Sequence, residues 1–174
     1  MRNKLCFFMI MFVLFNYSVL TALSTKGTEF WTAIPPTRIV MTNIYIYITS
    51  DNEATGNINI TNPVFNWDFS VAANGVTKIP IPGDSQLFNG DIVENKGIHI
   101  TASDEISVYV FNNSFANADG FTALPVKSVG TEYMALTYIS EIPQFVVVAT
   151  EDATSVSFTA AASITTKSAG IQYN

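Results

Sequence analysis

The chain has 174 residues, of which 48% are hydrophobic and 13% charged, and its net charge at pH 7 is −6. An acidic balance of this kind argues against a nucleic-acid-binding protein, because such proteins neutralise phosphates with Lys and Arg. The single cysteine, Cys6, excludes a disulfide framework and a zinc site that needs several cysteine ligands.

The first 24 residues have the features of a secretory signal peptide. Arg2 and Lys4 form a basic start, Leu5–Phe15 is an apolar run, and residues 22–24 (Ala-Leu-Ser) supply a small-x-small cleavage site. The apolar run is shorter than the roughly 20 residues of a membrane-spanning helix, so a retained signal anchor is the less favoured alternative. We predict that residues 25–174 are secreted to the extracellular space, without membrane attachment after cleavage. This segment keeps six basic and fourteen acidic residues, a net charge of −8.

The mature segment predicts an all-β fold. It contains seventeen Ile and thirteen Val but only three Leu, and branched side chains favour strands over helices. Apolar residues also alternate with polar or aromatic ones, the period of a half-buried strand. The clearest such segments are 44–49, 57–61, 98–102, 106–111 and 155–160. Short turn-rich connections predict an antiparallel sandwich or barrel-like sheet of about eleven short strands. The apolar run Phe145–Val148 predicts a central strand covered on both faces.

Three acidic segments interrupt the predicted strands: 49–51, 102–105 and 149–152. We expect each to form a turn that joins a strand pair, because acidic residues suit hairpin loops. Their spacing of about 50 residues leaves a propeller-like repeat as an alternative.

The inventory of catalytic groups is poor. His99, the only histidine, alternates with Ile98 and Ile100 and is expected to be an ordinary strand residue that points away from their face. The glycines form no phosphate-binding motif, so we expect no cofactor. Fourteen acids leave open a glycosidase pair, which needs two carboxyl groups about 5–9.5 Å apart. Calcium binding is a further alternative, for which the oxygen ligands would come from three acidic clusters: Asp51-Asn52-Glu53, Asp104-Glu105 and Glu151-Asp152.

Two N-glycosylation sequons follow the signal segment. Asn59-Ile60-Thr61 places Asn59 on the polar face of its predicted strand, and Asn112-Asn113-Ser114 falls at a predicted strand end in an Asn-rich loop. We therefore expect Asn59 and Asn112 to be accessible to modification.

Four aromatic residues lie opposite the Ile and Val face of their strands: Tyr45, Tyr47, Tyr109 and Phe111. If that face is exposed, they form an apolar patch suited to binding a partner. If a second layer covers it, they belong to the core, which is the favoured alternative for a chain so rich in strands.

Several motifs resemble, in order, the N-terminal domain family of the IgG Fc-binding protein. They are G-T-E-F-W at 27–31, the strands at 95–102 and 106–109, D-G at 119–120, A-L-P-V at 123–126, G-T-E-Y at 130–133 and A-T-E-D-A-T-S-V at 149–156. Phe30 and Trp31 are then expected as core anchors, Pro125 at a strand end or sheet edge, and Thr154 hydrogen-bonded across the Glu151-Asp152 turn. Gly130 is expected in a tight turn before a strand that begins near Tyr133.

The resemblance implies a secreted, non-enzymatic module that binds or adheres to other extracellular proteins or glycans. Immunoglobulin binding, which names the family, cannot be assigned to particular residues here. The family domain is longer than residues 25–174, so the resemblance also implies a domain that is incomplete at its C-terminus. The competing hypotheses are a secreted carbohydrate-active enzyme with a carboxylate pair, and a truncated product without independent function.

Overall fold

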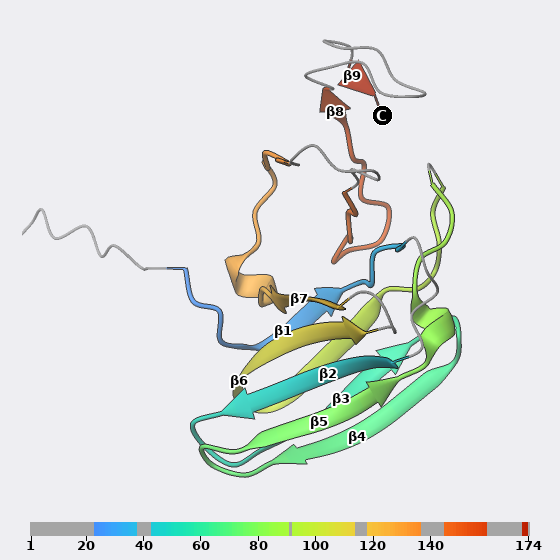
Figure 1. Ribbon diagram of the computed structural model, residues 1–174. Helices are drawn as coiled ribbons and strands as arrows, with labels where there is room; N and C mark the ends of the chain where they lie inside the picture. Colours follow the sequence, from blue (N-terminus) through green and yellow to red (C-terminus); the bar gives the residue numbers. More distant parts are fainter. Residues whose placement is uncertain are drawn as a thin grey trace, which may run out of the picture.

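The protein is built from antiparallel β-strands (Figure 1). The computed structural model describes residues 23–37, 43–90, 92–113, 118–136, 145–159 and 172–173, which contain nine strands, two 3-10 helices and no α-helix. The all-β prediction is confirmed, although about eleven strands was too many. The elements are β1 (Gly27–Thr32), β2 (Asn43–Ser50), β3 (Ala54–Ile60), β4 (Phe65–Val71), β5 (Val76–Ile81), η1 (Gly83–Ser85), β6 (Ile98–Asn113), β7 (Ala118–Ala123), η2 (Val126–Ser128), β8 (Phe158–Thr159) and β9 (Gln172–Tyr173).

The predicted signal segment, apart from residues 23 and 24, lies outside the described residues. Within the described part of the chain, no helix has the length and apolar character to cross a membrane.

Strand β6 organises the main sheet, which consists of β1 to β7, whereas β8 and β9 pair only with each other. Residue Ile106 of β6 pairs with Gly27 of β1 on one edge and with Ser50 of β2 on the other. Along the β2 edge, β2 pairs with residues 106–113 and β3 with residues 98–102, both antiparallel to β6. β2 and β3 therefore follow each other along one edge of β6, while β1 and β7 occupy the opposite edge.

The sheet bends where β2 passes into β3. This divides it into two halves: the β3 half (β4, β3, residues 98–102 of β6, and β1) and the β2 half (β5, β2, residues 106–113 of β6, and β7). The halves fold over and face each other, so the sheet is nearly closed into a barrel, as predicted (Figure 1). Strands β1 to β7 form this single folded sheet, which replaces the propeller alternative.

Two of the three predicted acidic turns lie at this bend and are not hairpins. Residues 103–105 are part of β6, and residues 51–53 lie between two strands that continue in the same direction. Hydrogen bonds join the two segments: the Asn52 Nδ2 donates to the Asp104 Oδ2 (3.0 Å), and the Ser50 hydroxyl donates to the Glu105 carbonyl oxygen (2.9 Å). Pairing between distant strands thus overrides the local turn tendency of acidic residues.

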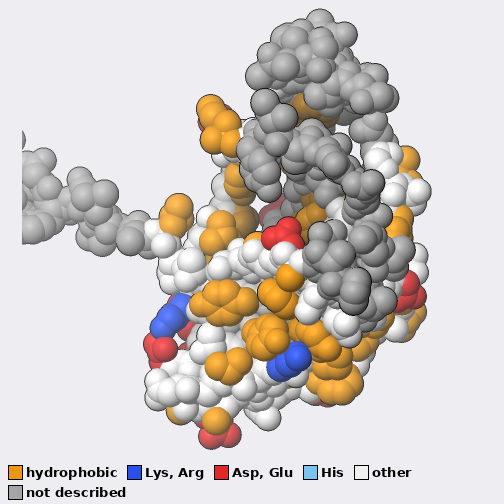
Figure 2. Space-filling model, viewed as in Figure 1, with side chains coloured by type: hydrophobic (Ala, Val, Ile, Leu, Met, Phe, Trp, Pro, Cys, Tyr) orange, Lys and Arg blue, Asp and Glu red, His pale blue; other side chains and the backbone are white. Residues whose placement is uncertain are grey.

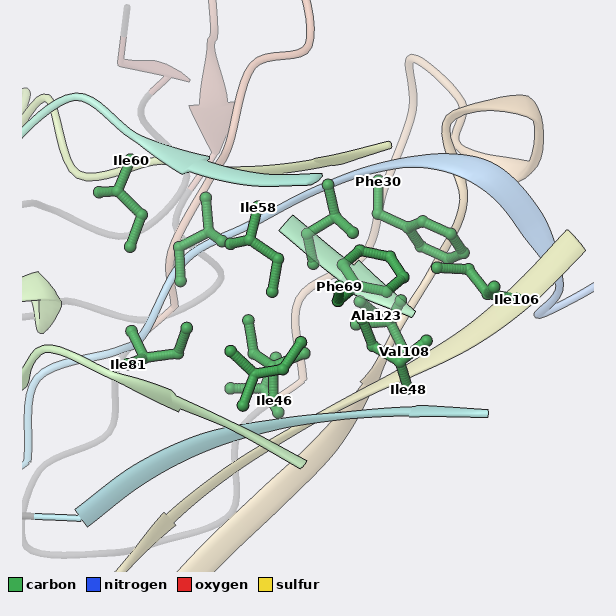
Figure 3. Packing of buried hydrophobic residues seen from close by; sticks show 14 of the residues in the cluster. Phe30, Ile46, Ile48, Ile58, Ile60, Phe69, Ile81, Ile106, Val108 and Ala123 are labelled. Atoms are coloured by element: carbon green, nitrogen blue, oxygen red, sulfur yellow. The ribbon is translucent and has the colours of Figure 1, made fainter. Parts of the chain in front are cut away.

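The core fills the space between the two halves. Figure 3 shows Ile58 and Ile60 of β3 facing Ile46 and Ile48 of β2, with Phe30 beside them. These five side chains are at most 1% exposed. The inward positions follow the alternation in the sequence, because successive side chains of a strand point to opposite faces. The core assignment of Phe30 is confirmed.

Two apolar segments predicted as strands are not strands. Residues 145–149 have no regular structure, and Phe145 and Val147 are 49% and 55% exposed, so the central strand predicted at Phe145–Val148 is wrong. The strand expected to begin near Tyr133 is absent from residues 133–136, where Tyr133 is 74% exposed. Neither segment pairs with another described strand, so hydrophobicity alone was misleading.

The connection between β5 and β6 is held by a buried carboxylate. The Glu94 side chain is 10% exposed, and its Oε1 accepts hydrogen bonds from the backbone N–H groups of Phe88 and Asn89, both 2.9 Å long. Its Oε2 lies 3.2 Å from the Lys96 Nζ. The backbone N–H groups of Asn89 and Phe88, together with Lys96, lower the pKa of the Glu94 carboxyl below its ordinary value.

The lowered pKa of Glu94 predicts that the free energy of unfolding depends on pH. A lowered folded-state pKa means that the stabilisation is fully present above the ordinary Glu pKa of about 4.3 and is lost as the pH falls through the folded-state value. Glu94→Gln should lower the free energy of unfolding by about 1 kcal/mol at neutral pH, because charge-assisted hydrogen bonds are stronger than neutral ones. Urea denaturation at pH 7 and at about pH 3 measures this, and the difference between the two proteins should be smaller at the lower pH.

The matched control is Glu53→Gln, which changes an exposed glutamate in the bend. Equal effects of the two substitutions at neutral pH, or a Glu94→Gln effect that persists in acid, would contradict the assigned role of Glu94.

Candidate functional site

A group of four aromatic side chains covers the outer side of the β2 half. Tyr45 and Tyr47 of β2 pair directly with Phe111 and Tyr109 of β6. The inward neighbours of these residues are the buried Ile and Val side chains, so the four rings share the opposite face. We call this group the aromatic face. Figure 2 shows hydrophobic side chains gathered over the front of the sheet, with a cationic side chain among them.

The aromatic face is open. Tyr109 is 42% exposed and the other three side chains are half-buried. The favoured expectation that a second layer would make these residues part of the core is therefore wrong. The sheet folds on itself to bury one face only, and this leaves its other face on the outside.

The rings are arranged edge to face. The centroids of Tyr45 and Tyr47 are 6.4 Å apart with an interplanar angle of 61°, and those of Tyr47 and Phe111 are 6.5 Å apart at 82°. Lys78 of β5 places its Nζ 3.6 Å from the Tyr45 ring centroid and 5.7 Å from that of Tyr47, within the range of a cation–π interaction. These contacts fix the relative positions of the ring side chains.

A shallow depression lies beside the rings, toward β7. Its lining includes Tyr47, Tyr109, Phe111, Gly120 and Thr122. Gly120 pairs with Phe111, and a Cβ at Gly120 would lie 3.0 Å from the Phe111 Cδ2. The missing side chain thus leaves one flank of the Phe111 ring uncovered.

His99 lies on the outer side of the β3 half, away from Ile98 and Ile100 as predicted. Its ring stacks on Trp31 with centroids 4.3 Å apart and an interplanar angle of 12°, and its Nε2 lies 3.0 Å from the Glu29 Oε1. Trp31 therefore packs on the outer face, and its predicted role as a core anchor is wrong.

Several carboxylates in the described part of the chain form ion pairs with basic side chains. Four such ion pairs are Lys26–Asp51, Lys96–Glu94, His99–Glu29 and Lys127–Glu105. Of the three acidic clusters considered for calcium, the bend brings together those of residues 51–53 and 104–105. Within the described residues, no group of three or more His, Cys, Asp or Glu residues is arranged to hold a metal ion.

The two sequons differ in accessibility. Asn59 is exposed on the outer side of β3, as predicted. Asn112 lies inside β6, paired with both Ile44 and Asp119, and is only 6% exposed. The predicted accessibility of Asn112 is wrong, because strand pairing places this asparagine in the sheet rather than in a loop. Its burial argues against a glycan there, and modification of Asn59 stays a prediction.

Two smaller predictions from the resemblance are confirmed. The Thr154 hydroxyl donates to the Glu151 carbonyl oxygen (2.7 Å), and Pro125 lies just beyond the end of β7, bridged to Phe30. Sequence reasoning missed Lys78 and Gly120. Lys78 shares one face of β5 with Val76 and Pro80, as the alternation predicts, but its contact with Tyr45 depends on how β5 pairs with β2.

Residues 119–174 match the family model described as IgGFc binding protein. The match confirms the predicted resemblance over this part of the chain, which carries the A-L-P-V, G-T-E-Y and A-T-E-D motifs. It also includes Gly120 and Thr122 in the depression beside the aromatic face. No curated protein and no solved structure shows significant similarity to the chain.

Proposed function

We propose, from the match of residues 119–174 to the IgGFc binding protein family, that this chain is a secreted extracellular module that binds a protein partner and performs no catalysis. The observation that carries the proposal is the aromatic face, four rings on the open side of a sheet. Tyr and Phe are enriched in protein interfaces, and such anchors supply most of the binding energy.

The ring geometry favours a protein over a glycan as the partner. The rings are inclined by 61° and 82° to their neighbours and do not form a flat platform for stacking sugars. Lys78 also occupies a face of Tyr45. An uneven apolar surface with a depression at its side suits the side chains of a protein, which can insert between the rings.

Secretion is supported by the basic start, the apolar run and the small-x-small site of residues 1–24. The carbohydrate-active enzyme alternative has less support, because the ion pairs described above engage several of the acids that it would need. The Fc part of IgG is the first partner to test, since the family description names it.

We expect Tyr109→Ala to weaken partner binding at least about tenfold, the effect of losing a central aromatic anchor. The measurement is biolayer interferometry of the full chain against immobilised Fc. If Fc is not bound, the same variant is compared with the parent protein in capture from an array of purified extracellular proteins.

Tyr133→Ala is the matched control, because Tyr133 is an exposed tyrosine outside the aromatic face. Loss of binding with Tyr109→Ala and not with Tyr133→Ala supports the proposal. Equal binding by the parent protein and both variants would show that the aromatic face is not part of the interface. If none of the purified extracellular proteins were captured, the binding function itself would be contradicted.

A further inference from the structure

The outer side of the β3 half differs in character from the aromatic face. Its middle is polar: the Asn57 Nδ2 donates to the Asn66 Oδ1 (2.8 Å) and to the Asp68 Oδ1 (2.7 Å). Burying these amide and carboxylate groups against an apolar partner would cost free energy unless each found a new hydrogen bond. This side is therefore suited to remain hydrated.

Asn59 lies on this polar side, near the end of β3. It pairs with Asn66 on one neighbouring strand and with His99 on the other. Ile60 points into the core and is 1% exposed. Asn59 and Thr61, its neighbours on either side, point outward and are both exposed. These two are the residues that the N-x-Ser/Thr sequon specifies. A sequon at an exposed position satisfies the steric requirement for an N-linked glycan.

The Trp31–His99 stack lies next to Asn59. Trp31 pairs with His99, which in turn pairs with Asn59, so the three residues form one row across β1, β6 and β3. Adjacent strands are about 4.8 Å apart, and the first sugars of a glycan on Asn59 can therefore reach both rings.

We propose that Asn59 carries an N-linked glycan and that this glycan covers the polar side of the β3 half and its Trp31–His99 stack. The aromatic face, on the opposite side of the folded sheet, is left uncovered for the partner. Asn112, buried in β6, carries no glycan in the folded protein. The inference rests on the proposed secretion, because N-glycosylation takes place in the secretory pathway.

The first experiment is translation of the full chain in the presence of microsomes. Protection from added protease reports entry into the lumen, and a mobility shift removed by PNGase F reports a glycan. We expect a protected chain with one glycan, lost in Asn59→Gln and retained in Thr61→Ser. The Ser114→Ala variant, which removes the second sequon without changing the buried Asn112, should leave the pattern of the folded protein unchanged.

The outcomes separate secretion from glycosylation. A protected chain without a glycan overturns the inference and leaves secretion standing. A chain that is not protected from protease contradicts secretion. In that case the full chain is expressed behind a heterologous cleavable signal peptide. A glycan on Asn59 in that experiment supports the inference, and its absence overturns it. A glycan on Asn112 in correctly folded protein would also overturn it.

A second measurement tests the coverage of this side. Hydroxyl-radical footprinting of the secreted protein before and after PNGase F treatment should show increased oxidation of Trp31 after the glycan is removed. Oxidation of Tyr109, on the aromatic face, should not change. Unchanged oxidation of Trp31, or equal increases at both residues, would contradict shielding by the glycan.

Discussion

Replacing Phe30 with alanine is expected to lower the free energy of unfolding by about 3–5 kcal/mol, the range for a buried phenylalanine. The Phe30 side chain is fully buried, and its ring lies among side chains from both halves of the sheet (Figure 3). Its removal leaves a cavity beside β6, a strand that is paired along both edges, so the site cannot collapse fully. A loss of this size is a large fraction of a typical stability of about 5–15 kcal/mol.

Urea denaturation of the purified protein measures the change as a shift of the midpoint at constant slope. Thr28→Ala is the control within the same strand, because Thr28 is exposed, and its effect should stay within about 0.5 kcal/mol. If Phe30→Ala shifted the urea midpoint as little as Thr28→Ala does, β1 would not contribute to the core.

Replacing Gly56 with alanine is expected to destabilise the protein by about 3 kcal/mol or more, at the upper end for an overpacked site. A Cβ at this position would lie 2.1 Å from the Thr101 carbonyl oxygen and 2.4 Å from the Phe69 Cζ. The Phe69 ring can rotate only by disturbing the core, in which it is 6% exposed. The Thr101 oxygen belongs to the backbone of β6, so relief requires β3 and β6 to move apart.

Gly90→Ala is the matched control, since no atom lies within 4 Å of its added Cβ. We expect that variant to unfold within about 0.5 kcal/mol of the parent protein in the same urea titration. Equal stability of the Gly56→Ala and Gly90→Ala variants would show that β3 and β6 do not approach each other closely at Gly56.

The core of the fold could be predicted from the sequence because one face of each strand is buried. Alternation of Ile44, Ile46 and Ile48 with aromatic residues assigns each side chain to a face without knowledge of the partner strand. The same alternation placed His99 on the outer side. These are local properties, and the structure confirms them.

The predictions that were wrong concern features that depend on how strands pair. The alternation shows that Tyr47 and Tyr109 share a face but not whether anything covers it, since this depends on the number of layers. Asn112 is in an Asn-rich segment typical of loops, yet Ile44 and Asp119 pair with it on either side. The acidic segment at 102–105 suits a turn, but hydrogen bonds from Ser50 and Asn52 keep it in an extended strand.

The candidate site could be predicted only in part. The sequence identified its four aromatic residues. It favoured a covered, core position for them over the exposed patch that the structure shows. Lys78 pairs with Tyr47, 31 residues earlier, and Gly120 pairs with Phe111, 9 residues earlier, and neither pairing has a local signature in the sequence. The burial of Asn112 and the exposure of Asn59 likewise follow from pairing rather than from the identical chemistry of the two sequons.

The central position of β6 has a consequence for synthesis on the ribosome. β1, β2 and β3 leave the ribosome before β6, the strand that pairs with all three. At about 5–20 residues per second, the isoleucine-rich faces of β2 and β3 wait several seconds for residues 98–113 to be translated. Such long-range pairing also slows folding itself. The nascent chain is thus most exposed to aggregation just before β6 emerges, and this interval is where a chaperone would have its greatest effect.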